Sequence, residues 1–299
     1  MPTSITIASN TLGGETRLVQ HVESTPLPEI VDVGSEALPD ASALQFKPVG
    51  RCIYCGSQDD LTKEHIVPFA LNGNAVLPQS SCKPCATVTG KFELQVLRGP
   101  LRAVRIYRRL QSRRGHLSAP AQYPLTIVRE GVQERVQVPL DQYPVLLHFP
   151  TFAVPRALTG TSGAGIAMSG ITTVSFGKNP QEVMRNLGAE RIVIDTHDDH
   201  PTAFARMLAK IAYAFAVGLG HDALLETPAA IVPSILGHRD DIGDWVGTHT
   251  GPIRKYSGAL HRIGIREDLH KGLLIADVHL FADSETPSYG VVLGRLARK

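Results

Sequence analysis

The sequence predicts an α+β protein in which a small cysteine-rich module precedes a larger domain with a mixed sheet. All four cysteines fall in one short stretch, as two Cys-x-x-Cys pairs at residues 52–55 and 82–85. After residue 116 most segments have the alternating pattern of strands, and only a few have helical spacing. With 299 residues, the chain is long enough for one large domain or two smaller ones.

Composition and charge exclude several classes of protein. Hydrophobic residues make up 43% of the chain, so a sizeable core is expected, and the net charge of +2 does not by itself indicate a partner. The N-terminus lacks the features of a signal peptide, and no apolar run approaches the ~18 residues of a membrane span. We therefore expect a cytoplasmic protein that does not bind a membrane. Neither composition nor charge indicates an oligomeric state.

Changes in pattern divide the chain into three segments. Residues 1–48 contain four prolines and little periodicity, which predicts an extended or partly disordered N-terminal arm. Residues 49–115 combine the cysteine-rich module with a helical extension, which Gly99-Pro100 should interrupt. Residues 116–299 form the predicted α+β domain, whose role the sequence does not indicate.

Turn and cap signals place the elements of the third segment. A hairpin is expected around Glu130-Gly131, a short helix where Asn179 precedes Pro180, and the longest helix at residues 200–220. The glycine-rich residues 159–170 lack the Lys-Ser/Thr ending of a phosphate-binding loop, so we expect a flexible loop there. Further strands are expected at residues 144–155, 171–176, 191–196, 260–267, 272–282 and 288–297.

The two Cys-x-x-Cys pairs predict one structural zinc site. A Cys-x-x-Cys turn presents two thiolates to the same ion, and two such turns complete a tetrahedral shell. Because four thiolates leave no open coordination position, this ion would hold structure and do no chemistry. If Cys52, Cys55, Cys82 and Cys85 share one ion, none remains for a disulfide, which fits a reducing compartment. The alternative is a group of four buried thiols without metal.

Glu64 and His65 lie between the two cysteine pairs and are followed by a turn at residues 72–74. Both Cys-x-x-Cys pairs, the Glu-His-x-x-Pro sequence and the helix start after Cys85 together resemble the HNH endonuclease family, in its branch with a four-cysteine zinc. The resemblance covers residues 50–95 only. It implies a ββα-metal fold, in which a hairpin and a helix hold one divalent ion against the scissile phosphate.

The resemblance assigns a role to each of these two residues. His65 would be the general base that activates a water, a task that suits an imidazole because histidine ordinarily titrates near pH ~6.5. Glu64 would be a carboxylate ligand of Mg²⁺ or another divalent ion, which would polarise the phosphate. Alternatively, Glu64 and His65 are a surface pair on a zinc-held loop.

Two positions depart from the family pattern. Ala86 stands where the family has an Asn or His ligand of the catalytic ion, and Leu77 stands near the position of the central Asn. On a helix that begins after Cys85, Ala86, Gly90 and Glu93 share a face, and helical side chains lean toward the N-terminus. We therefore expect Glu93 or a water to supply the missing ligand. The alternative is that Glu93 is an ordinary solvated helix residue.

A basic segment follows the module. Between residues 91 and 115, eight Lys and Arg side chains stand against a single acid. Guanidinium groups bind phosphates in a bidentate manner, so this segment predicts contact with a nucleic-acid backbone. The alternative is a solvated amphipathic face. The expected contacts are Lys91 and four arginines whose spacing would give a single stripe wherever the helix is continuous, Arg98, Arg102, Arg105 and Arg109.

The sequence therefore predicts a metal-dependent endonuclease that hydrolyses phosphodiester bonds, with nucleic acid, and DNA in particular, as its partner. It would carry a structural zinc ion and a catalytic Mg²⁺ or other divalent ion. Two other classes fit the same sequence. One is a non-catalytic, zinc-stabilised nucleic-acid-binding protein with a degenerate ion site. The other is a protein-interaction scaffold that uses the zinc site only for structure.

Overall fold

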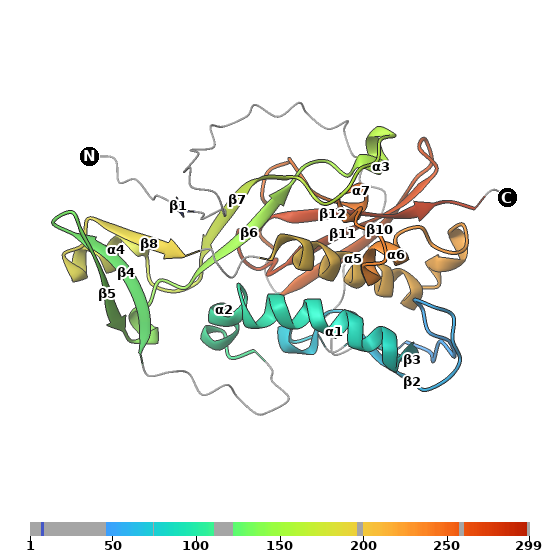
Figure 1. The fold of residues 1–299 in the computed structure, drawn as a ribbon, viewed down its shortest axis with the longest axis horizontal. Helices are drawn as coiled ribbons and strands as arrows, with labels where there is room; N and C mark the ends of the chain where they lie inside the picture. The colour runs from blue at the N-terminus through green and yellow to red at the C-terminus, as the bar shows by residue number, and fades with distance from the viewer. Residues whose placement is uncertain are drawn as a thin grey trace.

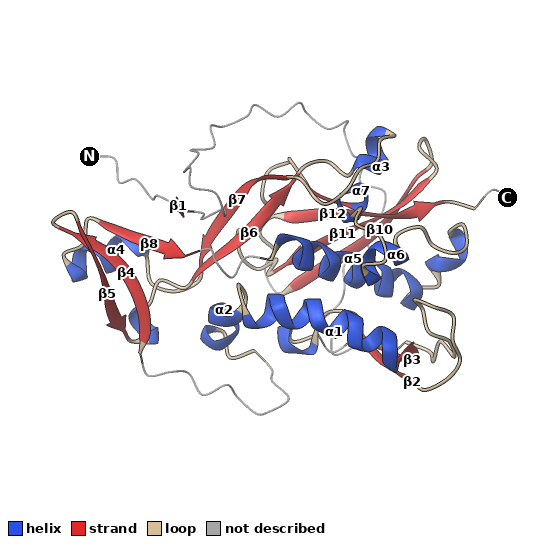
Figure 2. Ribbon diagram, viewed as in Figure 1, coloured by secondary structure: helices blue, strands red, loops and turns tan. Residues whose placement is uncertain are grey.

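The computed structural model describes residues 7–8, 46–73, 75–110, 122–195, 200–256 and 260–297. Most of this part of the chain forms a body of three layers: an antiparallel sheet, one long helix, and the cysteine-rich module (Figure 1). A smaller sheet lies at one end of the molecule. Helices and strands are both abundant, as the predicted mixed class requires (Figure 2). The predicted arm at residues 1–48 lies almost entirely outside the described residues.

The cysteine-rich module is a two-stranded hairpin followed directly by a helix. The strands β2 and β3 pair antiparallel, and a short helix lies in their connection. Pro84 is in the first turn of α1, where its missing N–H is harmless because a helix start leaves that group unpaired. The helical extension breaks at Gly99-Pro100, as predicted. The bounds are β2 Leu61–His65, η1 Phe69–Leu71, β3 Val76–Cys82, α1 Lys83–Arg98 and α2 Arg102–Tyr107.

Helix α5 (Pro201–Gly218) is the centre of the body. One side of α5 packs on a four-stranded antiparallel sheet of order β10-β11-β12-β9, and another side packs on α1. Because both sides are covered, the helix is apolar nearly all round. The strands are β9 Val246–Thr248, β10 His261–Asp268, β11 Leu273–Leu280 and β12 Ser288–Arg295.

A long hairpin, β6 (Leu146–Phe152) with β7 (Met168–Ser175), lies beside this sheet, and its connection contains the short helix α3 (Arg156–Thr159). Two more short elements, η3 (His221–Leu224) and α6 (Val232–Leu236), lead from α5 to α7 (Ile242–Trp245).

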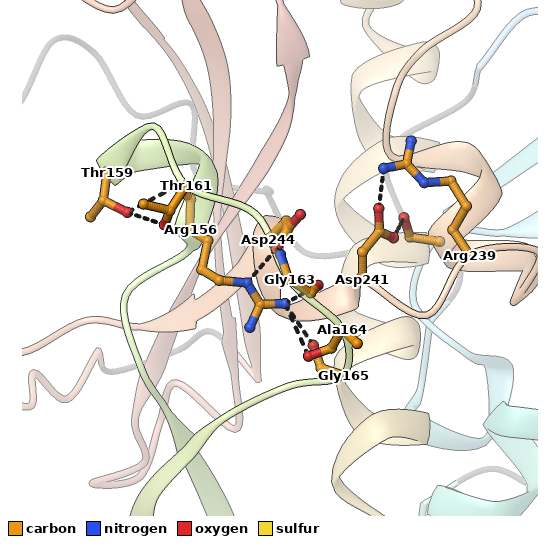
Figure 3. A network of polar contacts seen from close by, with 10 residues as sticks. Arg156, Thr159, Thr161, Gly163, Ala164, Gly165, Arg239, Asp241 and Asp244 are labelled. Atoms are coloured by element: carbon orange, nitrogen blue, oxygen red, sulfur yellow. Dashed lines mark hydrogen bonds and ion pairs between the residues drawn. The ribbon is translucent and has the colours of Figure 1, made fainter.

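The glycine-rich residues in the β6–β7 connection are held in place, in contrast to the flexible loop that we expected. The guanidinium of Arg156 pairs with Asp244 of α7 and donates to the Gly165 carbonyl at 2.9 Å (Figure 3). The Gly163 N–H donates to the Asp244 carboxylate at 3.1 Å. The loop is fixed because its backbone carbonyls serve as acceptors for one partly buried guanidinium.

The smaller sheet has the order β1-β8-β4-β5 and its own apolar core, to which α4 contributes. The expected turn at Glu130-Gly131 joins β4 to β5. The side chain of Asn179 accepts from the Gln181 N–H at 2.9 Å and caps α4, as predicted. The bounds are β1 Ile7–Ala8, β4 Tyr123–Arg129, β5 Val132–Val138, η2 Leu140–Gln142, α4 Pro180–Leu187 and β8 Arg191–Asp195.

The cysteine-rich module and the large sheet share one hydrophobic core. Buried side chains of the module such as Leu77 and Val96 belong to the same cluster as Leu208 of α5 and Val291 of β12. The module is therefore packed directly onto the rest of the body. No helix in the described part of the chain is both long enough and apolar enough to cross a membrane.

His261, at the start of β10, links the sheet to the module. Its Nε2 donates to the Leu71 carbonyl at 2.7 Å, and its Nδ1 accepts from the Phe281 N–H at 3.2 Å. One donor and one acceptor together require a neutral imidazole. Burial lowers the pKa of His261 to about 4, although the Leu71 carbonyl and Asp283 favour the charged form.

We expect the free energy of unfolding to fall as the pH drops from about 6.5 toward 4, because only the unfolded chain then binds a proton at His261. Urea unfolding of the wild type and of His261→Gln over this pH range measures the effect. The wild type should lose on the order of 2 kcal/mol more of its free energy of unfolding than the variant, because the glutamine does not titrate. The comparison isolates His261 from His148 and His279, whose pKa values burial also lowers. The same pH dependence in both proteins would contradict this account.

Candidate functional site

The four cysteines gather between the hairpin and the start of α1. Their Sγ atoms all lie within 4.8 Å of one another, and none is in a disulfide. The Sγ atoms of Cys55 and Cys82 are 3.6 Å apart. Two thiolates on a tetrahedral zinc ion with Zn–S bonds of ~2.3 Å would be ~3.8 Å apart. The donors and their spacing therefore fit a structural zinc ion held by Cys52, Cys55, Cys82 and Cys85.

The local backbone presents each cysteine pair. In the first pair, Cys52 lies in a tight turn, where its carbonyl accepts from the Gly56 N–H at 2.9 Å. Gly56 has a φ of 77°, which suits glycine because it carries no Cβ. Cys82 ends β3 and is also the N-cap of α1, so the second pair spans the helix start. The N-terminal end of the helix dipole favours thiolates there. The helix begins at Lys83, slightly earlier than we expected.

We expect the purified protein to bind zinc through all four thiolates, so Cys82→Ser should lose the metal and destabilise the module, because an incomplete shell holds zinc weakly. Elemental analysis measures the zinc content, and thermal unfolding measures the stability. Thr87→Ala, an exposed position on the same helix, is the matched control and should retain zinc. A wild-type protein that is folded but free of zinc would show that the four thiols need no metal.

The carboxylates of Glu64 in β2 and Glu93 in α1 meet at one cation, the ammonium of Lys210 in α5. Lys210 Nζ lies 2.7 Å from Glu64 Oε1 and 2.9 Å from Glu93 Oε1. It also donates to the His65 carbonyl and lies 3.5 Å from the Ile66 carbonyl oxygen. Lys210 is 0% exposed, so these charges are enclosed where α1, α5 and the hairpin meet.

The electrostatics of this group keep Lys210 charged. Burial alone would lower the pKa of Lys210, but Glu64 and Glu93 raise it to about 12. The hydroxyl of Tyr54 donates to Glu64 Oε2 at 3.4 Å, and burial together with the two carboxylates raises the Tyr54 pKa well above its usual value. An ammonium can be buried here because it has paired, hydrogen-bonded carboxylates around it.

His65 is held by the connection between β2 and β3. Its Nδ1 lies 3.1 Å from the Gly73 carbonyl oxygen. A carbonyl can only accept, so Nδ1 carries the proton and the lone pair of the neutral ring lies on Nε2. Position 73 requires glycine, since a Cβ there would lie 1.9 Å from the Val67 carbonyl oxygen. The ring of Phe69 meets the His65 ring edge-on at 5.6 Å between centroids.

The two departures from the family pattern leave no polar side chain at either position. Leu77 is buried in β3 directly opposite Glu64, and Ala86 lies in the second turn of α1. The carboxylate that reaches the cation from α1 is that of Glu93. Glu93 and Glu64 thus share one cation, the ammonium of Lys210.

The oxygen atoms around Lys210 Nζ form a donor set that suits a hard divalent ion. Magnesium binds carboxylate and carbonyl oxygens and retains several waters. Two carboxylates and the His65 carbonyl converge on the ammonium of Lys210. Glu64 and Glu93 could hold a divalent ion here if the ammonium moved away.

The basic residues next to the module differ in their surroundings. Lys91 and Arg98 on α1, and Arg102 and Arg109 on or after α2, are exposed. Arg105 is buried at 7% exposure and is bonded to backbone. Its Nε donates to the Ala70 carbonyl at 2.9 Å and its Nη1 to the Leu97 carbonyl at 2.7 Å. Burial, and then the charge of Arg98, lower the Arg105 pKa. The helix break at Gly99-Pro100 divides these residues between two helices.

Lys210 and Tyr54 were not found by the sequence analysis, although Lys210 left a signal. It is a charged residue in the long apolar stretch of α5, and a helix that is apolar on all sides is expected to be buried. A buried lysine requires carboxylate partners. The sequence does not say which of the 28 acidic residues they are. Nothing in the sequence distinguishes Tyr54 from an ordinary core tyrosine.

Comparison of the chain with protein-family models, with curated proteins and with solved structures gave no match. The geometry of the chain itself therefore carries the functional argument.

We expect Arg105→Ala to lower the free energy of unfolding by about 1–3 kcal/mol, because two carbonyls would lose their buried donor. Arg102→Ala should leave stability unchanged, because its side chain is exposed. Chemical denaturation of the two variants makes the comparison. Equal stability of both variants and the wild type would show that Arg105 does not brace the module.

Proposed function

We propose that the chain is a metal-dependent endonuclease of the HNH type, which hydrolyses phosphodiester bonds of nucleic acid and of DNA in particular. The observation that carries the proposal is the meeting of Glu64 and Glu93 at one cation position, with His65 next to Glu64 in the chain and its ring held by the Gly73 carbonyl. These side chains stand on a hairpin and helix joined by the four-cysteine group. The order of these parts along the chain is that of the family that residues 50–95 resemble.

Each residue would have a separate role in the reaction. His65 Nε2, which holds the lone pair, would accept a proton from the attacking water. Glu64 and Glu93 would supply carboxylate oxygens to a divalent ion, whose charge would stabilise the phosphate as negative charge develops. The exposed guanidiniums of Arg98, Arg102 and Arg109 would hold backbone phosphates without reading base sequence.

The proposal predicts that the zinc-loaded protein nicks supercoiled plasmid DNA when Mg²⁺ or Mn²⁺ is added. His65→Ala should reduce the rate by roughly 10²- to 10⁴-fold, the contribution typical of a general base. His270→Ala, an exposed histidine on the turn before β11, is the matched control and should cleave at the wild-type rate. An equal rate for His65→Ala and the wild type would exclude His65 as the base, and no cleavage by the wild type would contradict the proposal.

A second candidate is a non-catalytic nucleic-acid-binding protein, and two observations favour it. A fully buried ammonium takes the cation position, and Ala86 supplies no ligand. This candidate predicts binding without nicking, with an affinity that falls as salt rises. For both candidates, Arg102→Ala should weaken nucleic-acid binding. It should also reduce by about one the slope of the logarithm of the binding constant against the logarithm of the salt concentration, because one fewer counterion is released. Binding isotherms at several salt concentrations, measured beside the nicking assay, separate the two candidates.

A further inference from the structure

The side chain of Lys210 has the surroundings of a bound cation. Its ammonium is enclosed by oxygen atoms, with Glu64 Oε1 at 2.7 Å, Glu93 Oε1 at 2.9 Å and the Ile66 carbonyl at 3.5 Å, and it also donates to the His65 carbonyl. These oxygens come from the hairpin and from α1, whereas Lys210 comes from α5, far away in the sequence. The side chain is 0% exposed.

A divalent ion and this ammonium exclude each other. An ion that used both carboxylates would need the place of Nζ, because both carboxylates are turned toward that atom at hydrogen-bond distance. Two cations a few ångströms apart in a buried site would also repel each other strongly. With Lys210 in place the three side chains carry a net charge of −1, and without it the two carboxylates carry −2, which attracts a divalent ion more strongly.

We propose that Lys210 is an internal competitor for the divalent ion, so that metal enters this site only when the Lys210 ammonium leaves the two carboxylates. The inference rests on the metal site of the proposed function but does not require hydrolysis. Lys210 stabilises the two carboxylates in the metal-free protein. Metal therefore binds there only at concentrations high enough to displace the Lys210 ammonium. The linkage is reciprocal, since a bound ion weakens the hold of the carboxylates on Lys210 by the same factor.

The test is Mn²⁺ binding by the zinc-loaded full chain, measured by the electron paramagnetic resonance signal of free Mn²⁺. Lys210→Met keeps the length of the side chain and removes its charge. We expect this variant to bind Mn²⁺ roughly tenfold or more tightly than the wild type. Lys255→Met, at an exposed position, removes the same charge elsewhere and should bind like the wild type. Adding Glu64→Gln to Lys210→Met should abolish the gain.

Equal affinity of Lys210→Met and the wild type would overturn the inference, as would a gain that persists with Glu64→Gln. If Lys210→Met is too unstable to purify, the wild type provides a second measurement. Acylation of Lys210, followed by mass spectrometry, should be slow without metal and faster with saturating Mn²⁺, and an unchanged rate would equally overturn the inference. If Lys210→Met binds Mn²⁺ more tightly than the wild type but the wild type does not nick DNA, only the proposed endonuclease activity is refuted. If the wild type nicks DNA and the two proteins bind Mn²⁺ equally, only the competition by Lys210 is refuted.

Discussion

The ammonium of Lys210 holds together three elements that lie far apart in the sequence, because it pairs with Glu64 of the hairpin and Glu93 of α1 from its place in α5. Removal of one partner from such a buried group leaves an uncompensated charge, which is costly in a core. Moving the hairpin, α1 or α5 away from the other two would therefore leave a buried charge without its partner. The hairpin, α1 and α5 also contribute to one apolar cluster, which runs from the module to the large sheet.

The four-cysteine group and the Lys210 group have different tasks, although they lie in the same module. The cysteines join the first turn of the module to the start of α1, in a spacing that fits a closed zinc shell. The carboxylates of Glu64 and Glu93 meet further along β2 and α1. The cysteines therefore stand at one end of α1, and Glu93 lies further along the same helix. His65 is held separately, through the carbonyl of Gly73.

The basic residues show why sequence spacing alone was insufficient at this site. Arg98, Arg102, Arg105 and Arg109 have the spacing of one helical stripe, yet Arg105 turns inward to the Ala70 and Leu97 carbonyls. The break at Gly99-Pro100 separates α2 from α1, and the carbonyls at the end of α1 need donors. Arg105 donates to one of them, the Leu97 carbonyl, and also to the Ala70 carbonyl of η1, so one arginine of the four has a structural role.

The sequence by itself determined the local features of this protein: the cysteine spacing, the Asn179 cap, the turn at Glu130-Gly131 and the long apolar helix. Each depends on residues close together in the chain, whose effects on the backbone are short-range. Only the tertiary structure decided that Lys210 meets Glu64 and Glu93, and that the glycine-rich connection is held by Arg156. Buried charges choose partners by proximity in space, and many acidic residues of the sequence were equally suitable candidates.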